Sequence, residues 1–232
     1  WPRDSYSIMR RGRIKTRTVA EASTLYQIEA RVRVALRDRS PRQHIHATFA
    51  PQPRRGWQAG VIPPESRVAA ALVLLYPIDH QIHLVLTRRA GTLDQHAGQV
   101  SLPGGAVDVG ETIEAAALRE AREEIGLSTV DLRTLGTLSA LYIPVSNFAL
   151  HPVVSIADHR PHLVAATDEV AHILEVPLNQ LCDSTRLRKG WCWRDDEMIN
   201  VPYFEFMGER VWGATAMVLG ELTYLLEAAR WR

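Results

Sequence analysis

The chain has 232 residues, of which 46% are hydrophobic and 23% are charged, and its formal net charge is +1. This length and composition suit a globular protein with one main domain and an extension, and a charge so close to zero gives no support for binding nucleic acid or an acidic membrane surface. Two cysteines, Cys182 and Cys192, are too few for a disulfide framework. The longest apolar run, residues 68–76, is too short to cross a bilayer, which takes about 20 residues. We therefore expect a cytoplasmic protein without a membrane or nucleic-acid partner.

Residues 1–65 are predicted to be an N-terminal extension of a main domain at residues 66–232. Residues 1–20 are basic, and we interpret them as a solvated segment. A helix is predicted at residues 22–37, because apolar residues recur there at helical spacing. These residues are Leu25, Ile28, Val32 and Leu36. The helix could pack either on the main domain or on a second copy of the chain, as in a homodimer. Residues 38–66 contain five prolines and are predicted to be a connector.

The main domain begins with two apolar runs of strand length, residues 68–76 and 82–87, which a short turn joins. The loop that follows them ends in Gly104 and Gly105. Glycine has no Cβ, so the backbone of this loop can approach a ligand closely.

Residues 105–127, with the sequence GAVDVGETIEAAALREAREEIGL, are the most informative stretch of the chain. Residues 112–125 predict a helix, because they are rich in Ala, Leu, Glu and Arg and contain neither Pro nor Gly. Thr112 can cap the start of this helix, and Gly126 lies at a natural position to end it.

Three carboxylates share one face of this helix, because residues three and four positions apart are neighbours on a helix surface. They belong to Glu120, Glu123 and Glu124, and Arg119 lies one turn before Glu123 and can pair with it. Such a cluster is either a solvated charged face or a site for a hard divalent cation. Mg²⁺ takes oxygen ligands and keeps several waters, so one or two carboxylates and substrate phosphate oxygens suffice to bind it.

Beyond the helix, the chain alternates apolar runs with turn signals. Runs of strand length lie at residues 132–141, 149–156 and 170–176. Asn147 lies in a predicted turn between the first two, since asparagine tolerates a left-handed conformation. A short helix at residues 177–181, a hairpin at residues 186–206 and a helix ending near residue 230 complete the prediction.

The helix and its flanking glycines resemble the Nudix box. Every fixed position of that box is matched, by Gly105, Glu111, Arg119, Glu120, Glu123, Glu124 and Gly126. The resemblance implies an α+β fold, the Nudix α/β/α sandwich with a mixed β-sheet. It also implies an enzyme that hydrolyses a nucleoside diphosphate linked to another group, with Mg²⁺ or Mn²⁺ as cofactor and a small nucleotide as substrate.

The resemblance assigns roles to the side chains of the box. Glu120 and Glu124 would be the principal metal ligands, and Glu123 a further ligand, directly or through water. Arg119 would orient the glutamates, and Glu111 would support the geometry of the loop and helix.

The resemblance implies that water attacks phosphorus directly, and the sequence shows no Ser/His/Asp or Cys/His pattern that would argue for a covalent intermediate. The resemblance offers two residues as the base that removes the proton of this water, Glu123 and Glu169. Glu169 lies in a loop beyond the box, where a lone acid is otherwise a surface residue.

A second resemblance is to the coenzyme A pyrophosphatases, whose motif upstream of the box is LLTxR(S/A)x3Rx3Gx3FPGG. The matching residues are Leu86, Thr87, Arg89, Ala90, Gly98, Pro103, Gly104 and Gly105. Two residues depart from the motif: Asp94 stands where it has Arg, and Leu102 where it has Phe. The segment WGATA at residues 212–216 also resembles the end of domains in this group.

This second resemblance implies hydrolysis of coenzyme A or an acyl-CoA to 4′-phosphopantetheine, or its acyl form, and adenosine 3′,5′-bisphosphate. The substrate contacts would come from Arg88, Arg89, Gly104 and Gly105, and His96 could contribute. Loop packing and surface charge are the alternative roles of these side chains.

The sequence leaves two other functions open. Asp94 removes a cation that a phosphate would favour, and so it favours a Nudix hydrolase for ADP-ribose or another nucleotide sugar. A catalytically silent Nudix domain for ligand sensing is the other alternative, against which the complete set of glutamates argues.

Overall fold

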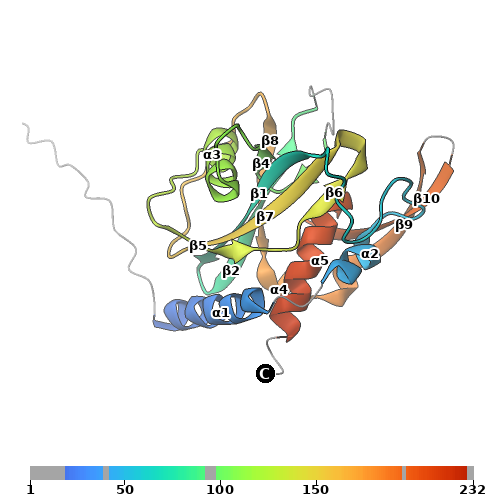
Figure 1. The fold of residues 1–232 in the computed structure, drawn as a ribbon. Helices are drawn as coiled ribbons and strands as arrows, with labels where there is room; N and C mark the ends of the chain where they lie inside the picture. The colour runs from blue at the N-terminus through green and yellow to red at the C-terminus, as the bar shows by residue number, and fades with distance from the viewer. Residues whose placement is uncertain (1–18, 39–41, 92–97, 195–196, 229–232) are drawn as a thin grey trace, which may run out of the picture.

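The computed structural model describes residues 19–38, 42–91, 98–194 and 197–228 (Figure 1). Most of the predicted basic segment lies outside the described residues, as do Asp94 and His96. In the part of the chain that the structure describes, no helix is both long and apolar enough to cross a membrane.

A mixed β-sheet forms the middle layer of the molecule. Its strands in the described residues are β1 (Arg67–Ile78), β2 (Gln81–Arg89), β3 (Val100–Ser101), β4 (Gly104–Ala106), β5 (Leu132–Thr137), β6 (Leu141–Ile143), β7 (Phe148–Ala157) and β8 (Val170–Pro177). The central path runs β3-β2-β1-β7-β5, with β4 pairing with β1, β6 with β7, and β8 with β2. Strands β1 and β7 are parallel, whereas the other pairs are antiparallel. Strand β1 is apolar almost throughout, because both of its faces are covered.

Helices cover both faces of this sheet (Figure 1). Helix α3 (Ile113–Ile125) packs on one face, where its alanines meet alternate residues of β1, such as Leu72 and Leu74. The other face carries α1 (Val19–Arg37), α2 (Gln43–Phe49) and α5 (Gly213–Ala228), which share a second apolar core with Val73 and Leu75 of β1. The predicted α+β sandwich with a mixed sheet and an N-terminal helix is therefore confirmed.

Helix α1 packs on the main domain rather than presenting its apolar stripe outward. Leu25 and Val32 are buried, and Ile28 and Leu36 pack against the same core. Of the two alternatives for this helix, the structure shows contact with its own chain. The homodimer, like the domain boundary after residue 65, stays a prediction.

The predicted connector at residues 38–66 contains a helix, α2, that the sequence analysis missed. The helix is only seven residues long, and a helix of this length is not stable by propensity alone. Its stability comes from tertiary contacts, because Ile45, His46 and Phe49 are buried against α5. These three buried positions were not predicted, because the connector as a whole has a low apolar content.

The strand predicted at residues 132–141 is divided into β5 and β6. The chain leaves the ladder after Thr137, and the backbone N–H of Ser139 donates to the carboxylate of Glu221 on α5, with distances of 3.1 and 3.2 Å to its two oxygens. Asn147 has a φ of 52°, which confirms the left-handed turn expected there.

A smaller antiparallel sheet lies beside the main sheet. It consists of β9 (Leu187–Arg194), β10 (Glu197–Phe206) and β11 (Glu209–Trp212) in the order β11-β10-β9, and α4 (Leu178–Leu181) precedes it. Strands β9 and β10 form the predicted hairpin. Strand β11 runs directly into α5, which brings the segment at residues 212–216 to the edge of the main sheet.

Candidate active site

Helix α3 is fixed at both ends by the residues that the sequence indicates. The side chain of Thr112 accepts a hydrogen bond from the backbone N–H of Ala115 at 3.2 Å. Gly126 ends the helix with a φ of 63°, in the left-handed region that favours glycine. Ala117 and Ala121 are fully buried against the sheet, and this packing sets the rotation of the helix and so the direction of its carboxylates.

The three glutamates of α3 lie at three different depths. The side chain of Glu124 is 4% exposed, that of Glu120 is 16% exposed and that of Glu123 is 58% exposed. The Oε2 atom of Glu124 is buried and has no hydrogen-bond partner in the described part of the chain. An unpaired buried carboxylate oxygen is costly to the fold, and it is the feature that a bound cation would satisfy.

Arg119 joins the acidic side chains of the box. Its guanidinium donates to Glu111 at 3.0 and 3.1 Å, to Glu120 at 2.8 Å and to Glu123 at 3.2 Å. It also donates to the backbone oxygen of Ala106 at 2.9 Å, which fastens the helix to β4. This arrangement can orient the glutamates and support the loop, as the resemblance implies for Arg119 and Glu111.

Burial and neighbouring acids raise the pKa of two of the glutamates. Burial raises the pKa of Glu124 to about 7, and the negative charges of Glu120 and Glu169 add to the effect, whereas Arg89 opposes it. The pKa of Glu120 is also raised, first by burial, with Arg119 opposing and Glu123 and Glu169 adding. Glu169 is exposed in the loop before β8, where its backbone oxygen accepts a hydrogen bond from Ala90 at 2.8 Å, and its charge adds to the raised pKa of both box residues.

The carboxylates fit a divalent cation that also takes ligands from water and substrate. Among the described residues, no three His, Cys, Asp or Glu side chains converge closely enough to form a complete set of protein ligands. Glu124, with its unpaired buried oxygen, and the neighbouring Glu120 offer a partial set with excess negative charge. This is the kind of site at which Mg²⁺ keeps waters and binds phosphate oxygens.

Gly105 leaves the space that Glu120 occupies. A Cβ atom at this position would lie 2.5 Å from the Glu120 carboxylate. We therefore predict that Gly105→Ala displaces this carboxylate and lowers kcat by about a hundredfold, as a misplacement of about 1 Å can. The clash is with the end of a side chain rather than with backbone, so the melting temperature should change little. Kinetics and thermal unfolding of Gly105→Ala would be compared with Gly91→Ala, whose Cβ meets nothing within 4 Å. A kcat equal to that of wild type in Gly105→Ala would contradict the assignment of the Glu120 carboxylate to the active site.

Arg88 and Arg89 have different partners, and the register of β2 with β8 shifts between them. The guanidinium of Arg89 lies 4.0 Å from Glu124 and lines the cavity described below. Arg88 instead forms an ion pair with Glu209 on β11, and it is not among the residues that line this cavity. The structure thus places Arg89 beside Glu124 and pairs Arg88 with Glu209, and contact of either arginine with the substrate stays a prediction.

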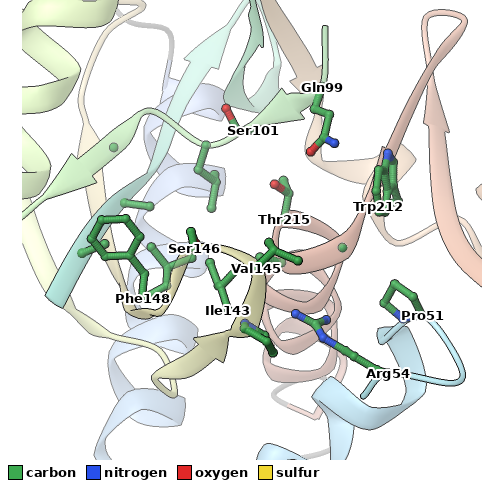
Figure 2. Close-up of a pocket in the computed structure, with 18 of the residues that line it drawn as sticks. Pro51, Arg54, Gln99, Ser101, Ile143, Val145, Ser146, Phe148, Trp212 and Thr215 are labelled. Carbon is green, nitrogen blue, oxygen red and sulfur yellow. The ribbon is translucent and has the colours of Figure 1, made fainter. Parts of the chain in front are cut away.

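A cavity of about 780 Å³ opens beside Gly104 and Gly105 (Figure 2). Its walls come from four stretches of the chain, namely residues 51–55, 99–106, 143–150 and 212–215, with Arg89, two alanines of β1 and two residues of β10. A volume of this size is typical of small-molecule sites. Residues 51–55 were not predicted to take part, because their only signal is a pair of arginines in a proline-containing connector.

Comparison with known proteins agrees with this arrangement. Residues 66–200, more than half of the chain, match the NUDIX domain family. The chain therefore belongs to the Nudix family and is a Nudix hydrolase, a pyrophosphatase that acts on a nucleoside diphosphate-linked substrate. Members of this family typically use divalent metal ions.

Among its relatives are proteins named uncharacterized Nudix hydrolase NudL. The one from Citrobacter koseri is 37% identical over 142 residues, which cover 60% of this chain and 72% of that protein. The one from Photorhabdus laumondii is 31% identical over 172 residues, which cover 72% of this chain and 91% of that protein. A solved structure, the Nudix hydrolase RenU from M. smegmatis, is 28% identical with a TM-score of 0.45, covering 56% of this chain and 84% of that one.

Proposed function

We propose that this Nudix hydrolase cleaves the diphosphate of coenzyme A or an acyl-CoA. The products would be adenosine 3′,5′-bisphosphate and 4′-phosphopantetheine or its acyl form. One observation supports this substrate above all. The two segments that resemble coenzyme A pyrophosphatases, residues 86–105 and 212–216, lie far apart in the sequence, yet both line the cavity beside Gly105. Their shared place suggests that they recognise one ligand.

We assign the metal site to Glu120 and Glu124, with Glu123 as a further or water-mediated ligand, and Mg²⁺ or Mn²⁺ as the ion. A bound cation would neutralise the diphosphate and so favour attack by water. The depth of Glu124 supports its assignment, because its unpaired oxygen is closed off from bulk solvent. Arg119 positions Glu120 and Glu123 through the hydrogen bonds described above.

In the proposed reaction, the oxygen of a water molecule forms a bond to one phosphorus and the bond from that phosphorus to the bridging oxygen breaks. The proton of the water passes to a carboxylate, and the leaving phosphate takes the electron pair of the broken bond. Glu123 and Glu169 stay the two choices for this base. Glu123 is exposed and already accepts a hydrogen bond from Arg119, whereas Glu169 is exposed in the loop before β8 and its charge raises the pKa of Glu124.

The remaining substrate contacts are proposed for Arg89, Gly104 and Gly105. Arg89 lines the cavity, and its buried Nε has no hydrogen-bond partner within the described residues, so a phosphate oxygen could accept from it. The two glycines expose backbone at the wall of the cavity. Arg88 would act indirectly, by holding Glu209.

ADP-ribose is the second candidate substrate, because Asp94 replaces the arginine of the coenzyme A motif. The two are distinguished by kcat/KM for a panel of CoA, acetyl-CoA, ADP-ribose, NADH and diadenosine polyphosphates with Mg²⁺ or Mn²⁺. We expect CoA or acetyl-CoA to have the highest value. A higher value for ADP-ribose would refute the proposed substrate, and turnover of none would favour the silent ligand-sensing domain.

A further inference from the structure

The segment at residues 51–55, which precedes the Nudix domain, is firmly attached to the wall of the cavity. Gln52 and Asn200 of β10 exchange two backbone hydrogen bonds, of 2.8 and 2.7 Å. Arg55 lies 3.3 Å from the carboxylate of Glu197 on the same strand. The first contact fixes the backbone two residues before Arg54, and the second is a solvent-exposed ion pair between side chains on its other side.

The side chain of Arg54 extends from this segment into the cavity. In Figure 2 its guanidinium points toward the space between Ile143 and Thr215, across the cavity from Gln99 and Ser101. It is positioned by the sulfur of Met217 on α5, 3.0 Å from Nη1, and by the ring of Trp57, whose centre lies 5.1 Å from the guanidinium carbon. The cation is therefore held in a defined place and half-buried.

The surroundings of Arg54 indicate what it would bind. The neighbouring walls are formed largely by apolar side chains such as Ile143, Val145 and Trp212, and Glu197 also lines the cavity. A guanidinium has a planar array of donors that binds several acceptors at once and matches phosphate oxygens. A ligand that places its diphosphate at α3 would therefore carry a second anionic group on an arm that reaches into the cavity.

Coenzyme A has one such arm. The pantetheine arm ends in a neutral thiol or acyl group, whereas the adenosine arm carries a 3′-phosphate. We propose that the cavity holds the adenosine end of the substrate and that Arg54 binds its 3′-phosphate. This inference rests on the proposed function and adds to it the orientation of the substrate and a specificity-determining residue outside the Nudix domain. It also supplies a cation for this phosphate in a chain where Asp94 replaces the arginine of the motif.

The test compares two substrates that differ only in this phosphate, CoA and 3′-dephospho-CoA, in the full chain. The readout is the ratio of their kcat/KM values for wild type, Arg54→Ala, Arg54→Lys and a control. Arg210→Ala is the matched control, because Arg210 is exposed and also stacks on an aromatic ring, that of Tyr203, at 5.0 Å. Both substrates meet the same preparation of each variant, so any loss of folded protein cancels from the ratio.

We expect wild type and Arg210→Ala to favour CoA by about tenfold or more, the size of one or two charge-assisted hydrogen bonds. Arg54→Ala should lower this ratio by about tenfold, and Arg54→Lys should give an intermediate value. If both substrates were turned over and the ratio of kcat/KM for CoA to that for 3′-dephospho-CoA were the same in wild type and Arg54→Ala, the role of Arg54 would be overturned. The proposed function would stand. Turnover of neither substrate by wild type would overturn the proposed function together with it.

Discussion

Replacing Glu124 with glutamine is expected to lower kcat by about a thousandfold while leaving the fold intact. The change removes the buried charge that we assign to the metal site, and the loss of one preorganised electrostatic group in an active site costs about 10²–10³ in rate. Glutamine has nearly the same shape, so packing beneath α3 is kept. The measurement is steady-state kinetics at saturating substrate over a titration of Mg²⁺.

The same substitution should raise stability when metal is absent. Burial raises the pKa of Glu124 from its ordinary value of 4.5 to about 7, so the folded protein holds this proton more tightly than the unfolded chain does. Stability therefore falls as the pH rises from about 4.5 to about 7, and the full cost of the buried charge is present at pH 8. Glu124→Gln removes that cost and should melt at a higher temperature than the metal-free wild type at pH 8.

Glu114→Gln is the matched control, because Glu114 is exposed in the first turn of the same helix. We expect its kcat and its melting temperature to stay close to those of wild type. If Glu124→Gln kept a kcat within about threefold of wild type, Glu124 could not be a principal metal ligand.

The buried carboxylate of Glu221 connects α2 and α5 with the loop between β5 and β6, and its removal is expected to lower the stability of the fold strongly. Glu221 is fully buried and lies 3.0 Å from Nε of Arg42 and 2.8 Å from Nε2 of His46. Ser139 donates to it through its hydroxyl at 2.8 Å as well as through its backbone N–H. Glu221→Ala would leave Arg42, itself 9% exposed, without this carboxylate. We expect the free energy of unfolding to fall by about 3–5 kcal/mol.

Denaturant unfolding would measure this loss, with Glu227→Ala as the control on the exposed side of α5. Burial alone would raise the pKa of Glu221, but the hydrogen bonds from His46 and Ser139 outweigh it and lower the pKa below 4.5. The stabilisation is therefore fully present above pH 4.5 and is lost as the pH falls through the lower, folded value. A loss of under about 1 kcal/mol at pH 7 would contradict the account of this network.

The features that the sequence predicted well depend on contacts close along the chain. The helix of the box is bounded by Thr112 and Gly126, whose capping needs only their immediate neighbours. The apolar runs of β1 and β2 could be recognised as strands because strands buried in the core have nearly continuous apolar sequences. In the same way, the left-handed turn at Asn147 could be predicted from that residue alone.

The features that it missed depend on contacts between distant segments. Helix α2 forms because Phe49 and its neighbours pack against α5. Ser139 lies outside the sheet, and its backbone N–H donates to Glu221 on α5 rather than to a neighbouring strand. Helical spacing placed Glu120, Glu123 and Glu124 on one face, but it could not show that Gly105 of β4 lies beside Glu120 or that Arg89 of β2 lies beside the buried Glu124. The position of Arg54 could not be foreseen, because only the folded chain brings its segment to the cavity.

The products formed from CoA distinguish the proposed reaction from the alternatives. The full chain would be incubated with CoA and Mg²⁺, and both products would be identified by mass spectrometry, with a metal-chelated sample as the blank. The account predicts adenosine 3′,5′-bisphosphate and 4′-phosphopantetheine in equal amounts, and neither in the blank. Intact CoA under conditions in which ADP-ribose is cleaved would contradict it.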